Sequence, residues 1–428
     1  MSDERHRANL PPLSLHVPEP LFRPGDTVDF AAVAVPPVAA ARRPDTAEPA
    51  AAFTDLAYGL VRVLGDDASA SGAWDPRLSP DTLRQLLRAM ALTRAFDERM
   101  FRAQRQGKTS FYMKSTGEEA VAVAQAFALD RDDMCFPSYR QQGILIARGC
   151  PLVDMMNQIY SNAGDKLMGR QLPIMYSEKR FGFFSISGNL ATQYPQAVGW
   201  AMASAAKGDT RIAATWCGDG STAEGDFHSA CTFSSVYRVP VILNVVNNQW
   251  AISSFSGFAG AEETTFAARG VGYGIAALRV DGNDALAVYA ATAWAAERAR
   301  TNHGPTLIEH FTYRAEGHST SDDPTQYRSA GEPNAWPLGD PIRRLKDHLI
   351  VLGEWDEERH VAQDKELAEQ VKAAQKQAEG QGVLGHGLHQ RFETMFEGVF
   401  EDLPWHLKEQ QAQMLAEETA SGRPWAKH

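Results

Sequence analysis

Two apolar runs that flank one helical stretch constrain the fold of this chain more than any other feature. The runs are RIAATWC (211–217) and PVILNVV (240–246), and the segment EGDFHSACTFSSVYR between them has the pattern of a helix. Short runs of aliphatic residues are typical of buried strands, and one helix is what a parallel crossover needs. The segment therefore predicts a strand–helix–strand unit of a parallel sheet.

Polar residues follow both predicted strands. The sequence Gly218-Asp219-Gly220-Ser221 comes after the first strand, and Asn247-Asn248 comes directly after the second. Because ligands bind beyond the carboxyl ends of strands in open parallel sheets, Asp219 and Asn248 are expected to lie side by side at one site. A carboxylate, an amide oxygen and a backbone carbonyl are too few for a complete cage, which suits Mg²⁺ completed by water and phosphate oxygens.

A diphosphate is the ligand that these residues imply. Gly218 and Gly220 would let the backbone approach it closely, and a helix that begins near Ala223 could present its N–H groups to the anion. Either motif alone is a common turn or loop start. Their order, strand context and separation together favour a metal–diphosphate site.

The rest of the central region continues the alternation of strands and helices. Three further apolar runs are candidate strands: 134–138, 277–282 and 306–313. A helix is predicted over 285–300. This alternation predicts an α/β fold, a parallel sheet flanked by helices, over residues 76–350.

Both ends of the chain differ from this central region. Residues 1–75 are rich in Pro and Ala, and the density of prolines up to about residue 50 predicts an extended arm. A long amphipathic helix is predicted to begin at Ser79-Pro80. Residues 351–428 are a predicted helical extension. One apolar stripe of this extension contains Val361, Leu367 and Val371, and a second, typical of core or subunit contact, contains Phe392, Met395, Phe396, Val399, Phe400 and Leu403.

Composition disfavours several classes of function. The chain has 428 residues, and 42 Lys and Arg against 53 Asp and Glu give a net charge of -11, which argues against a surface that collects nucleic-acid phosphates. Its four cysteines share no CxxC spacing, so neither a zinc knuckle nor a disulfide framework is indicated. No run of 18 apolar residues exists, and the first residues mix acids with bases, unlike a secretory signal. We therefore expect a cytoplasmic protein without a nucleic-acid or membrane partner.

The stretch GDGSTAEGDFHSACTFSSVYRVPVILNVVNNQWAIS resembles the thiamin diphosphate signature of the α subunits of 2-oxo acid dehydrogenase first components (E1). Three more blocks follow the order of that family: FPSYRQQGILIARG, ISGNLATQYPQAVGWAMA and TYRAEGHSTSDDPTQYR. The resemblance covers about residues 80–350. The motifs STAEGD, AARGVGYG and HSTSDD are similar to those of the branched-chain 2-oxo acid enzymes rather than to those of pyruvate dehydrogenase.

The resemblance implies a role for each matching residue. Asp219, Asn248 and the main-chain oxygen of Trp250 would bind Mg²⁺. His318 would lie at the diphosphate and the mouth of the active site, where a histidine with a pKa near neutrality could exchange protons during acyl transfer. The implied cofactor contacts are Tyr139, Arg140, Gly188, Leu190, Gly218, Asp219, Gly220, Ser221, Asn248, Ile252 and His318.

A potassium site is also implied, built from hydroxyl, carbonyl and amide oxygens. This sequence departs from the animal branched-chain enzymes there, because Gly188-Asn189 stands where they have Ser-Pro. The matching positions are Ser187, Asn189, Thr192 and Gln193.

A second departure is Val246, which stands where those enzymes carry a phosphate-binding arginine. Neutralisation of the diphosphate would then rely on Arg140, Mg²⁺ and His318, helped by Arg269.

The resemblance implies oxidative decarboxylation of a branched-chain 2-oxo acid, such as 3-methyl-2-oxobutanoate, with transfer of the acyl group to the lipoyl group of a second component (E2). The cofactors would be thiamin diphosphate, Mg²⁺ and K⁺. No segment supplies a second α/β domain for the pyrimidine half of the cofactor, so an E1 β subunit is expected to complete the site in an α2β2 heterotetramer. The alternatives are the α subunit of a pyruvate or acetoin dehydrogenase and a non-catalytic scaffold. A nicotinamide enzyme is set aside because no GxGxxG follows an early strand.

Overall fold

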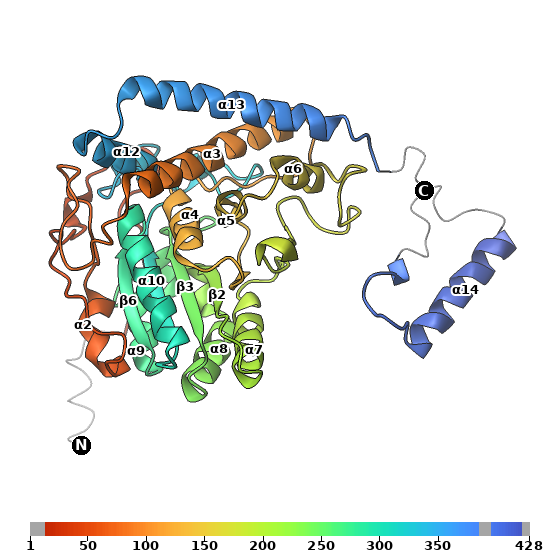
Figure 1. The fold of residues 1–428 in the computed structure, drawn as a ribbon, viewed down its shortest axis with the longest axis horizontal. Helices are drawn as coiled ribbons and strands as arrows, with labels where there is room; N and C mark the ends of the chain where they lie inside the picture. Colours follow the sequence, from red (N-terminus) through yellow and green to blue (C-terminus); the bar gives the residue numbers. More distant parts are fainter. Residues whose placement is uncertain (1–12, 385–394, 422–428) are drawn as a thin grey trace, which may run out of the picture.

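The computed structural model describes residues 13–384 and 395–421, and a parallel sheet lies at its centre (Figure 1). The spatial order of its strands is β1-β2-β3-β7-β6, and every neighbouring pair is parallel. The strands are β1 (Met134–Phe136), β2 (Ala213–Gly218), β3 (Val241–Asn247), β6 (Ala276–Asp281) and β7 (Thr306–Phe311). All of the strands predicted from the sequence are present, and the α/β fold with a parallel sheet is confirmed.

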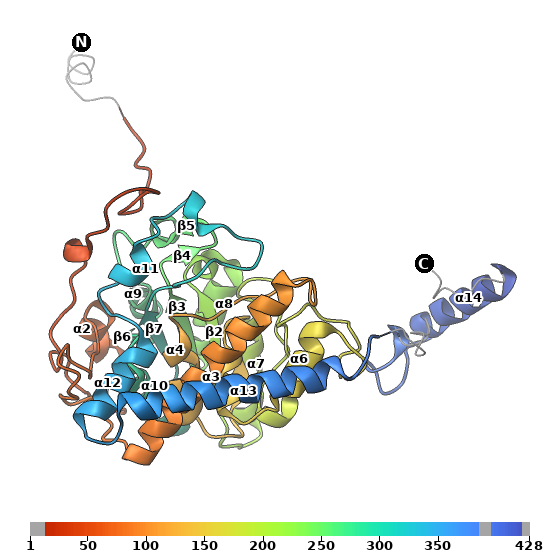
Figure 2. The ribbon, with the colours of Figure 1, turned by 90° about the horizontal axis from the view of Figure 1, so that it is seen from above.

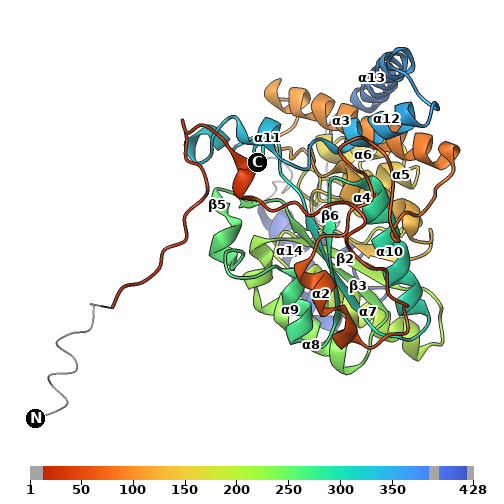
Figure 3. The ribbon, with the colours of Figure 1, turned by 90° about the vertical axis from the view of Figure 1, so that its left-hand side faces the viewer.

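Helices cover both faces of this sheet (Figure 3). On one face, α4 (Glu119–Ala128) and α10 (Ala285–Arg300) share a core with Ala214 and Trp216 of β2. On the other face, α7 (Gln193–Ala206) and α8 (Gly225–Val236) share a second core with Ala213 and Cys217 of the same strand. Successive side chains of β2 thus enter opposite cores, as the pleat of a strand requires. The helix α9 (Ala267–Gly272) belongs to the second face.

The predicted N-terminal arm consists of two different parts. Residues 13–49 contain no regular element longer than the 3-10 turn η1 (Phe30–Ala32). After η2 (Ala50–Phe53) and α2 (Thr54–Tyr58), however, the chain runs beside β6, where Val61 pairs in parallel with Val280. Buried side chains in this part are Phe53, Leu56, Leu60, Val63, Leu64 and Trp74. Only the first part is an extended arm, because the large apolar residues of the second part enter the core, with the exception of Tyr58, which is 57% exposed.

Three helices form a further layer along one side of the molecule (Figure 2). The predicted helix α3 (Pro80–Arg105) begins where expected, and the Ser79 hydroxyl accepts a hydrogen bond from the Thr82 amide (3.2 Å) as its N-cap. It packs against α12 (Pro341–Val351) and α13 (Glu357–Glu379). Of the first predicted C-terminal stripe, Leu367 and Val371 are buried, whereas Val361 is 66% exposed.

The second predicted C-terminal stripe is wrong as a helix. Residues 397–403 form bends and coil, and Met395, Val399 and Phe400 are exposed. Gly398 has a φ of +78°, which interrupts helical backbone there. Phe392 lies outside the described residues. The helix α14 (Trp405–Ser421) follows, buries no side chain and stands apart from the rest of the molecule (Figure 1).

Short elements connect these layers. They are α5 (Gln142–Ala147), α6 (Leu152–Tyr160), η3 (Lys179–Phe181), η4 (Gly220–Ala223), β4 (Trp250–Ala251), β5 (Ser254–Phe255), η5 (Ser256–Ala259), η6 (Pro324–Gln326) and α11 (Glu332–Ala335). The strands β4 and β5 pair as a small antiparallel hairpin directly after β3. No helix in the described part of the chain is long and apolar enough to cross a membrane.

Candidate active site

The segments that follow four neighbouring strands meet at the carboxyl edge of the sheet. Gly218 of β2 pairs with Val246 of β3, so Asp219 and Asn248 leave the sheet next to each other. Arg140 follows β1, and His318 follows β7, the other neighbour of β3. Arg140 and His318 are in direct contact, although 178 positions separate them in the sequence. The topology thus brings the loops of Arg140, Asp219, Asn248 and His318 to one edge of the sheet.

Asp219 is buried with one of its two carboxylate oxygens unpaired. Oδ1 accepts a hydrogen bond from the Gly220 amide (2.7 Å). Oδ2 has no partner, and among the described residues it is the only buried carboxylate oxygen in that condition. Burial raises the pKa of Asp219 to about 7. A buried anionic oxygen without a donor is costly, which indicates that a cation or another donor belongs beside it.

Asn248 and Trp250 supply the other two oxygens that were expected to bind the metal. The Asn248 Nδ2 group donates to Glu118 Oε1 (2.7 Å), which leaves Asn248 Oδ1 with only a long contact from the Trp250 amide (3.3 Å). The main-chain oxygen of Trp250 accepts one hydrogen bond from Arg314 (2.9 Å) and keeps a second lone pair. Together with Asp219 Oδ2, these are hard oxygen donors of the kind that Mg²⁺ takes, so the residues present fit the implied ion.

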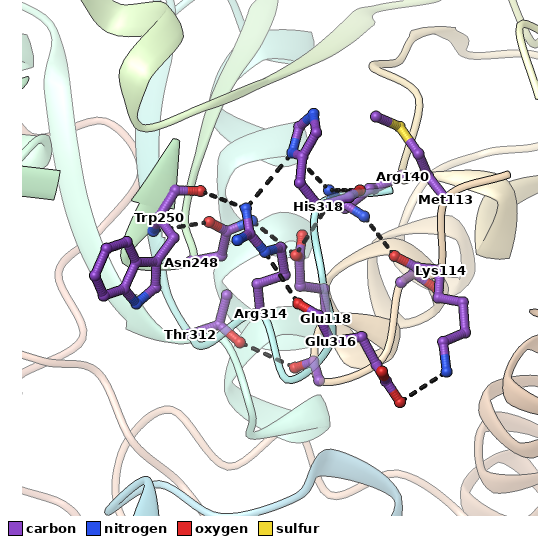
Figure 4. Close-up of polar contacts among 12 residues, drawn as sticks. Met113, Lys114, Glu118, Arg140, Asn248, Trp250, Thr312, Arg314, Glu316 and His318 are labelled. Atoms are coloured by element: carbon purple, nitrogen blue, oxygen red, sulfur yellow. Dashed lines mark hydrogen bonds and ion pairs between the residues drawn. The ribbon is translucent and has the colours of Figure 1, made fainter. Parts of the chain in front are cut away.

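Arg140 is buried and holds the loop of His318 (Figure 4). Its Nη1 group donates to the Lys114 carbonyl (2.5 Å), and its Nη2 group donates to the His318 carbonyl (2.7 Å) and lies 3.1 Å from His318 Nδ1. Tyr139 packs its ring edgewise against the His318 ring, with 5.8 Å between the centroids. The Tyr139-Arg140 pair is therefore part of the site, but both ends of the guanidinium already engage protein carbonyls.

The structure corrects the expected pKa of His318. Burial, with the nearby charges of Arg140 and Arg314, lowers this pKa to about 3 rather than leaving it near neutrality. Arginine can only donate hydrogen bonds, so the Nδ1 atom that faces Arg140 and Arg314 must be an acceptor. The proton of the neutral ring is consequently on Nε2.

Arg314 is a member of the site that sequence analysis did not identify. It is fully buried and donates to the Trp250 carbonyl (2.9 Å), the Ile252 carbonyl (2.8 Å) and the Tyr327 hydroxyl (2.7 Å). Because it holds the Trp250 carbonyl, Arg314 provides a positive charge beside the end of β3, the strand that contains Val246. The expected helper Arg269 is engaged elsewhere, because its guanidinium donates to the carbonyls of Thr222 and Ala259. No local pattern distinguishes Arg314 in the sequence.

Comparison with known proteins gives the family of this chain. The family described as dehydrogenase E1 component matches residues 87–385, which include every strand of the sheet. The chain belongs to the dehydrogenase E1 component family. A second family, described as 2-oxoisovalerate dehydrogenase E1 alpha subunit N terminal, matches residues 11–51. This match covers the first part of the arm.

Named relatives of this E1 chain come from bacteria and animals. It is 62% identical to the 2-oxoisovalerate dehydrogenase subunit alpha of Pseudomonas aeruginosa over 403 residues, which cover 94% of this chain and 98% of the relative. It is 41% identical over 338 residues to the mitochondrial alpha subunits of Mus musculus and Homo sapiens. Those matches cover 79% of this chain and 75% and 74% of the two relatives, respectively.

The loop before α7 in this E1 chain carries the remaining expected residues. Gly188 and Asn189 are exposed, and Leu190 is 47% exposed. Within the expected potassium set, the Thr192 hydroxyl donates to the Asn189 carbonyl (3.2 Å), and the Ser187 hydroxyl accepts from the Asn189 amide (3.1 Å). Gln193 is buried, and its Nε2 group donates to the Trp216 carbonyl (2.5 Å). These oxygens are partly committed to one another, so potassium binding stays a prediction.

Ile252 has a backbone conformation that is rare for its residue type. Its φ is +55°, in the left-handed region that a β-branched side chain seldom adopts. Two hydrogen bonds from Arg314 hold the carbonyls on either side of Ala251 and so fix this turn. The Ile252 side chain is 54% exposed, and strain of this kind persists where the surroundings enforce it, often at functional sites.

Gly220 lies where the end of β2 approaches the β4–β5 hairpin. A Cβ atom on Gly220 would lie 2.5 Å from the Ala251 Cβ, so any side chain would push the two segments apart. Gly218 has no such neighbour, and Ser221 is buried at the start of η4. Of the expected glycines, Gly220 is the one that the local packing requires.

Proposed function

We propose that this E1 chain is the α subunit of a 2-oxoisovalerate dehydrogenase, which decarboxylates branched-chain 2-oxo acids oxidatively and transfers the acyl group to a lipoylated E2. The observation that carries the proposal is the unpaired Asp219 Oδ2 after β2, in the loop next to the one that carries Asn248 and Trp250 after the paired strand β3. The family membership and the names of the relatives support it.

The cofactor of this proposal is thiamin diphosphate with Mg²⁺. Asp219, Asn248 and the Trp250 carbonyl would hold Mg²⁺, and the arginines of the strand-end loops would hold the diphosphate. When bound, thiamin diphosphate supplies an electron sink for loss of CO₂ from the 2-oxo acid. The contribution of the chain is to orient the diphosphate end and to balance its charge.

Arg140 and His318 provide donors rather than a titrating pair. The Nη1 group of Arg140 retains one N–H after its bond to the Lys114 carbonyl, so the guanidinium can still donate to a phosphate oxygen. The neutral His318 ring carries its proton on Nε2, and it would donate that hydrogen bond to an anionic oxygen. Because the Arg140 guanidinium holds the His318 carbonyl, both donors keep a fixed relation.

A β subunit partner follows from the exposed apolar residues around this edge. Leu190 and Ile252 are about half exposed, at 47% and 54%, and Phe258 is 60% exposed nearby in the chain. A cofactor ring lying against Leu190 and Ile252 would remain in water unless another subunit covered it. We infer an α2β2 heterotetramer in the cytoplasm, in which the E1 β subunit completes the site, and a K⁺ ion bound by the loop before α7.

Two alternatives differ from this proposal in measurable ways. The α subunit of a pyruvate or acetoin dehydrogenase would share the metal–diphosphate residues, but the named relatives favour branched-chain substrates. A non-catalytic scaffold has no need for the buried Asp219, and the retention of Asn248, Arg140 and His318 argues against it.

The deciding experiment is isothermal titration of thiamin diphosphate with Mg²⁺ into the chain, alone and co-expressed with its β subunit, followed by CO₂ release assays. We expect tight binding only in the co-expressed sample. CO₂ release should be faster from 3-methyl-2-oxobutanoate than from pyruvate, and acetoin should not be oxidised. Preference for pyruvate or acetoin would select that alternative, whereas binding in neither sample would leave the scaffold.

A further inference from the structure

The segment Thr116-Gly117-Glu118-Glu119 is pressed against the strand-end loop that carries Arg314. The Ala315 amide donates to the Thr116 carbonyl (3.1 Å), and the Thr312 hydroxyl donates to the Gly117 carbonyl (3.0 Å). Gly117 has a φ of +95°, and a Cβ atom there would lie 2.3 Å from the Tyr313 carbonyl oxygen. Only glycine permits this approach, which brings the first residues of α4 to the edge of β3 and β7.

The two glutamates of this segment have separate partners. Glu119 is fully buried, accepts from Arg94 Nε (2.7 Å) and accepts from the Gly117 amide (2.9 Å). Glu118 is 2% exposed and accepts from Asn248 Nδ2 (2.7 Å), and its Oε1 lies 3.7 Å from Arg140 Nε (Figure 4). Thus Glu119 fastens the segment to α3, whereas Glu118 contacts two expected cofactor-binding residues.

The chemistry of Glu118 fixes the orientation of the Asn248 amide. An amide presents an oxygen acceptor on one side and an NH₂ donor on the other, and rotation by half a turn exchanges them. Glu118 Oε1 also lies 3.7 Å from Arg140 Nε, which can only donate, so this oxygen is an acceptor for both of its neighbours. Nδ2 of Asn248 must therefore face Glu118, and Oδ1 must face the opposite side, where the Trp250 amide meets it.

The same carboxylate fixes the rotation of the Arg140 guanidinium. Its Nε edge faces Glu118, and its two Nη groups face Lys114 and His318. A guanidinium with all three nitrogens engaged has one orientation. The single carboxylate of Glu118 thus sets the direction of one expected metal ligand and one expected phosphate ligand.

We propose that Glu118 is a positioning residue of this site, which turns the Asn248 Oδ1 atom toward Mg²⁺ and holds the Arg140 guanidinium for the diphosphate. This inference rests on the proposed function. Neither the signature GDG…NN nor the family resemblance pointed to Glu118. Removing a group that orients a metal ligand typically lowers metal affinity by about ten- to a hundredfold.

The test is the Mg²⁺ dissociation constant of the α/β complex, measured by isothermal titration at saturating thiamin diphosphate. Glu118→Gln should raise it by about tenfold or more, because a glutamine can donate as well as accept and so permits both amide orientations. The matched control is Glu119→Gln, the same substitution at the neighbouring buried carboxylate, which should leave the Mg²⁺ dissociation constant within about twofold. Thermal unfolding of each complex checks that both variants are folded.

A rescue variant distinguishes a lost orientation of the residue 248 side chain from a general disruption of the site. In Glu118→Gln with Asn248→Asp, the glutamine can donate to one aspartate oxygen while the other faces the metal, so the hydrogen bond is kept with its polarity reversed and the charge count is unchanged. We expect this double variant to recover most of the lost Mg²⁺ affinity. An unchanged dissociation constant in Glu118→Gln, an equal loss in Glu119→Gln, or no recovery in the double variant would overturn the positioning role alone. Absence of Mg²⁺-dependent binding in the wild-type complex would overturn the proposed function and this inference with it.

Discussion

Two buried groups of charged residues in this chain are paired to very different degrees. The first, the arm joint, consists of Arg62, Asp281, Asp284 and Arg344, and it connects the arm with β6, α10 and α12. Both oxygens of Asp281 accept from Arg344 (3.0 and 2.9 Å), and Oδ2 also accepts from Arg62. Asp284 accepts four backbone amides, from Val63, Leu64, Leu286 and Ala287.

The second group, the strand-end cluster, consists of Glu118, Arg140, Asp219, Arg314 and His318. Here Asp219 Oδ2 has no partner, and two arginines lie close to a neutral histidine. The arm joint is satisfied by protein groups alone, as buried charges in a structural role must be. In the strand-end cluster the Asp219 carboxylate is not satisfied by the described protein groups, and we propose that Mg²⁺ and the diphosphate complete it. Burial of charge therefore does not distinguish the two groups, whereas the unpaired carboxylate oxygen of Asp219 does.

Asp219→Asn should show the largest difference between the two groups, because we expect it to weaken cofactor binding without lowering stability. It removes the charge that the cation needs, so Mg²⁺-dependent binding of thiamin diphosphate to the α/β complex should weaken by more than about a hundredfold. The melting temperature without cofactor should stay the same or rise at pH 8, because a neutral amide no longer carries the cost of a buried carboxylate. Titration calorimetry and a thermal melt measure the two effects. Wild-type affinity, or a fall in melting temperature by many degrees, would place Asp219 with the structural charges instead.

Asp281→Asn should show the reverse behaviour in the arm joint. The substitution leaves Arg62 and Arg344 buried without their shared carboxylate, which typically costs about 3–5 kcal/mol of folding free energy. Urea unfolding would measure this loss, and the Mg²⁺ affinity of the folded protein should not change. The matched control is Asp66→Asn, since Asp66 pairs with the same Arg62 but its side chain is 97% exposed, so about 0.5 kcal/mol or less is expected. Equal losses in both variants would mean that burial does not govern the pair.

Local sequence patterns were enough to predict the strands and helices from which the site residues emerge. The strand-end positions of Asp219 and Asn248 follow from two apolar runs and one crossover, and α10 begins and ends at the predicted residues 285 and 300. Such elements are set by neighbours in the sequence. Only the family resemblance placed Arg140 and His318 at one site, and their contact depends on β1 and β7 lying on either side of the pair β2 and β3.

What was missed depends on contacts across long sequence separations. Glu118 reaches Asn248 over 130 positions, and Arg314 reaches Trp250 over 64, so no periodicity signals either one. The pKa of His318 depends on two arginines from other segments. The second C-terminal stripe failed for the opposite reason, because helical spacing of Met395 and Val399 predicted packing where Gly398 turns the chain.

His310 sharpens the comparison, because it also has an unpaired buried atom but no net charge. It lies within β7, its Nε2 is 3.0 Å from Asn244 Oδ1, and its Nδ1 has no partner. Burial lowers its pKa to about 3, so the folded protein keeps the ring neutral while the unfolded chain binds a proton below about 6.5. The contribution of neutral His310 to the unfolding free energy is therefore complete above pH 6.5 and is lost as the pH falls toward 3. The loss amounts to about 2 kcal/mol at pH 5.

His310→Gln should remove this acid sensitivity. Glutamine can still donate to Asn244 but does not titrate, so the difference in unfolding free energy between pH 7 and pH 5 should be about 2 kcal/mol smaller than in the wild type. Urea unfolding at the two pH values measures it, and the pH 7 value in each protein serves as its own reference. The smaller cost of an unpaired neutral nitrogen explains why the core tolerates Nδ1 of His310 without a ligand, whereas we propose a cation beside the Asp219 oxygen. Identical pH dependence in the two proteins would show that the pKa of His310 is the same in the folded and unfolded states, and the distinction between charged and neutral unpaired atoms would then fail.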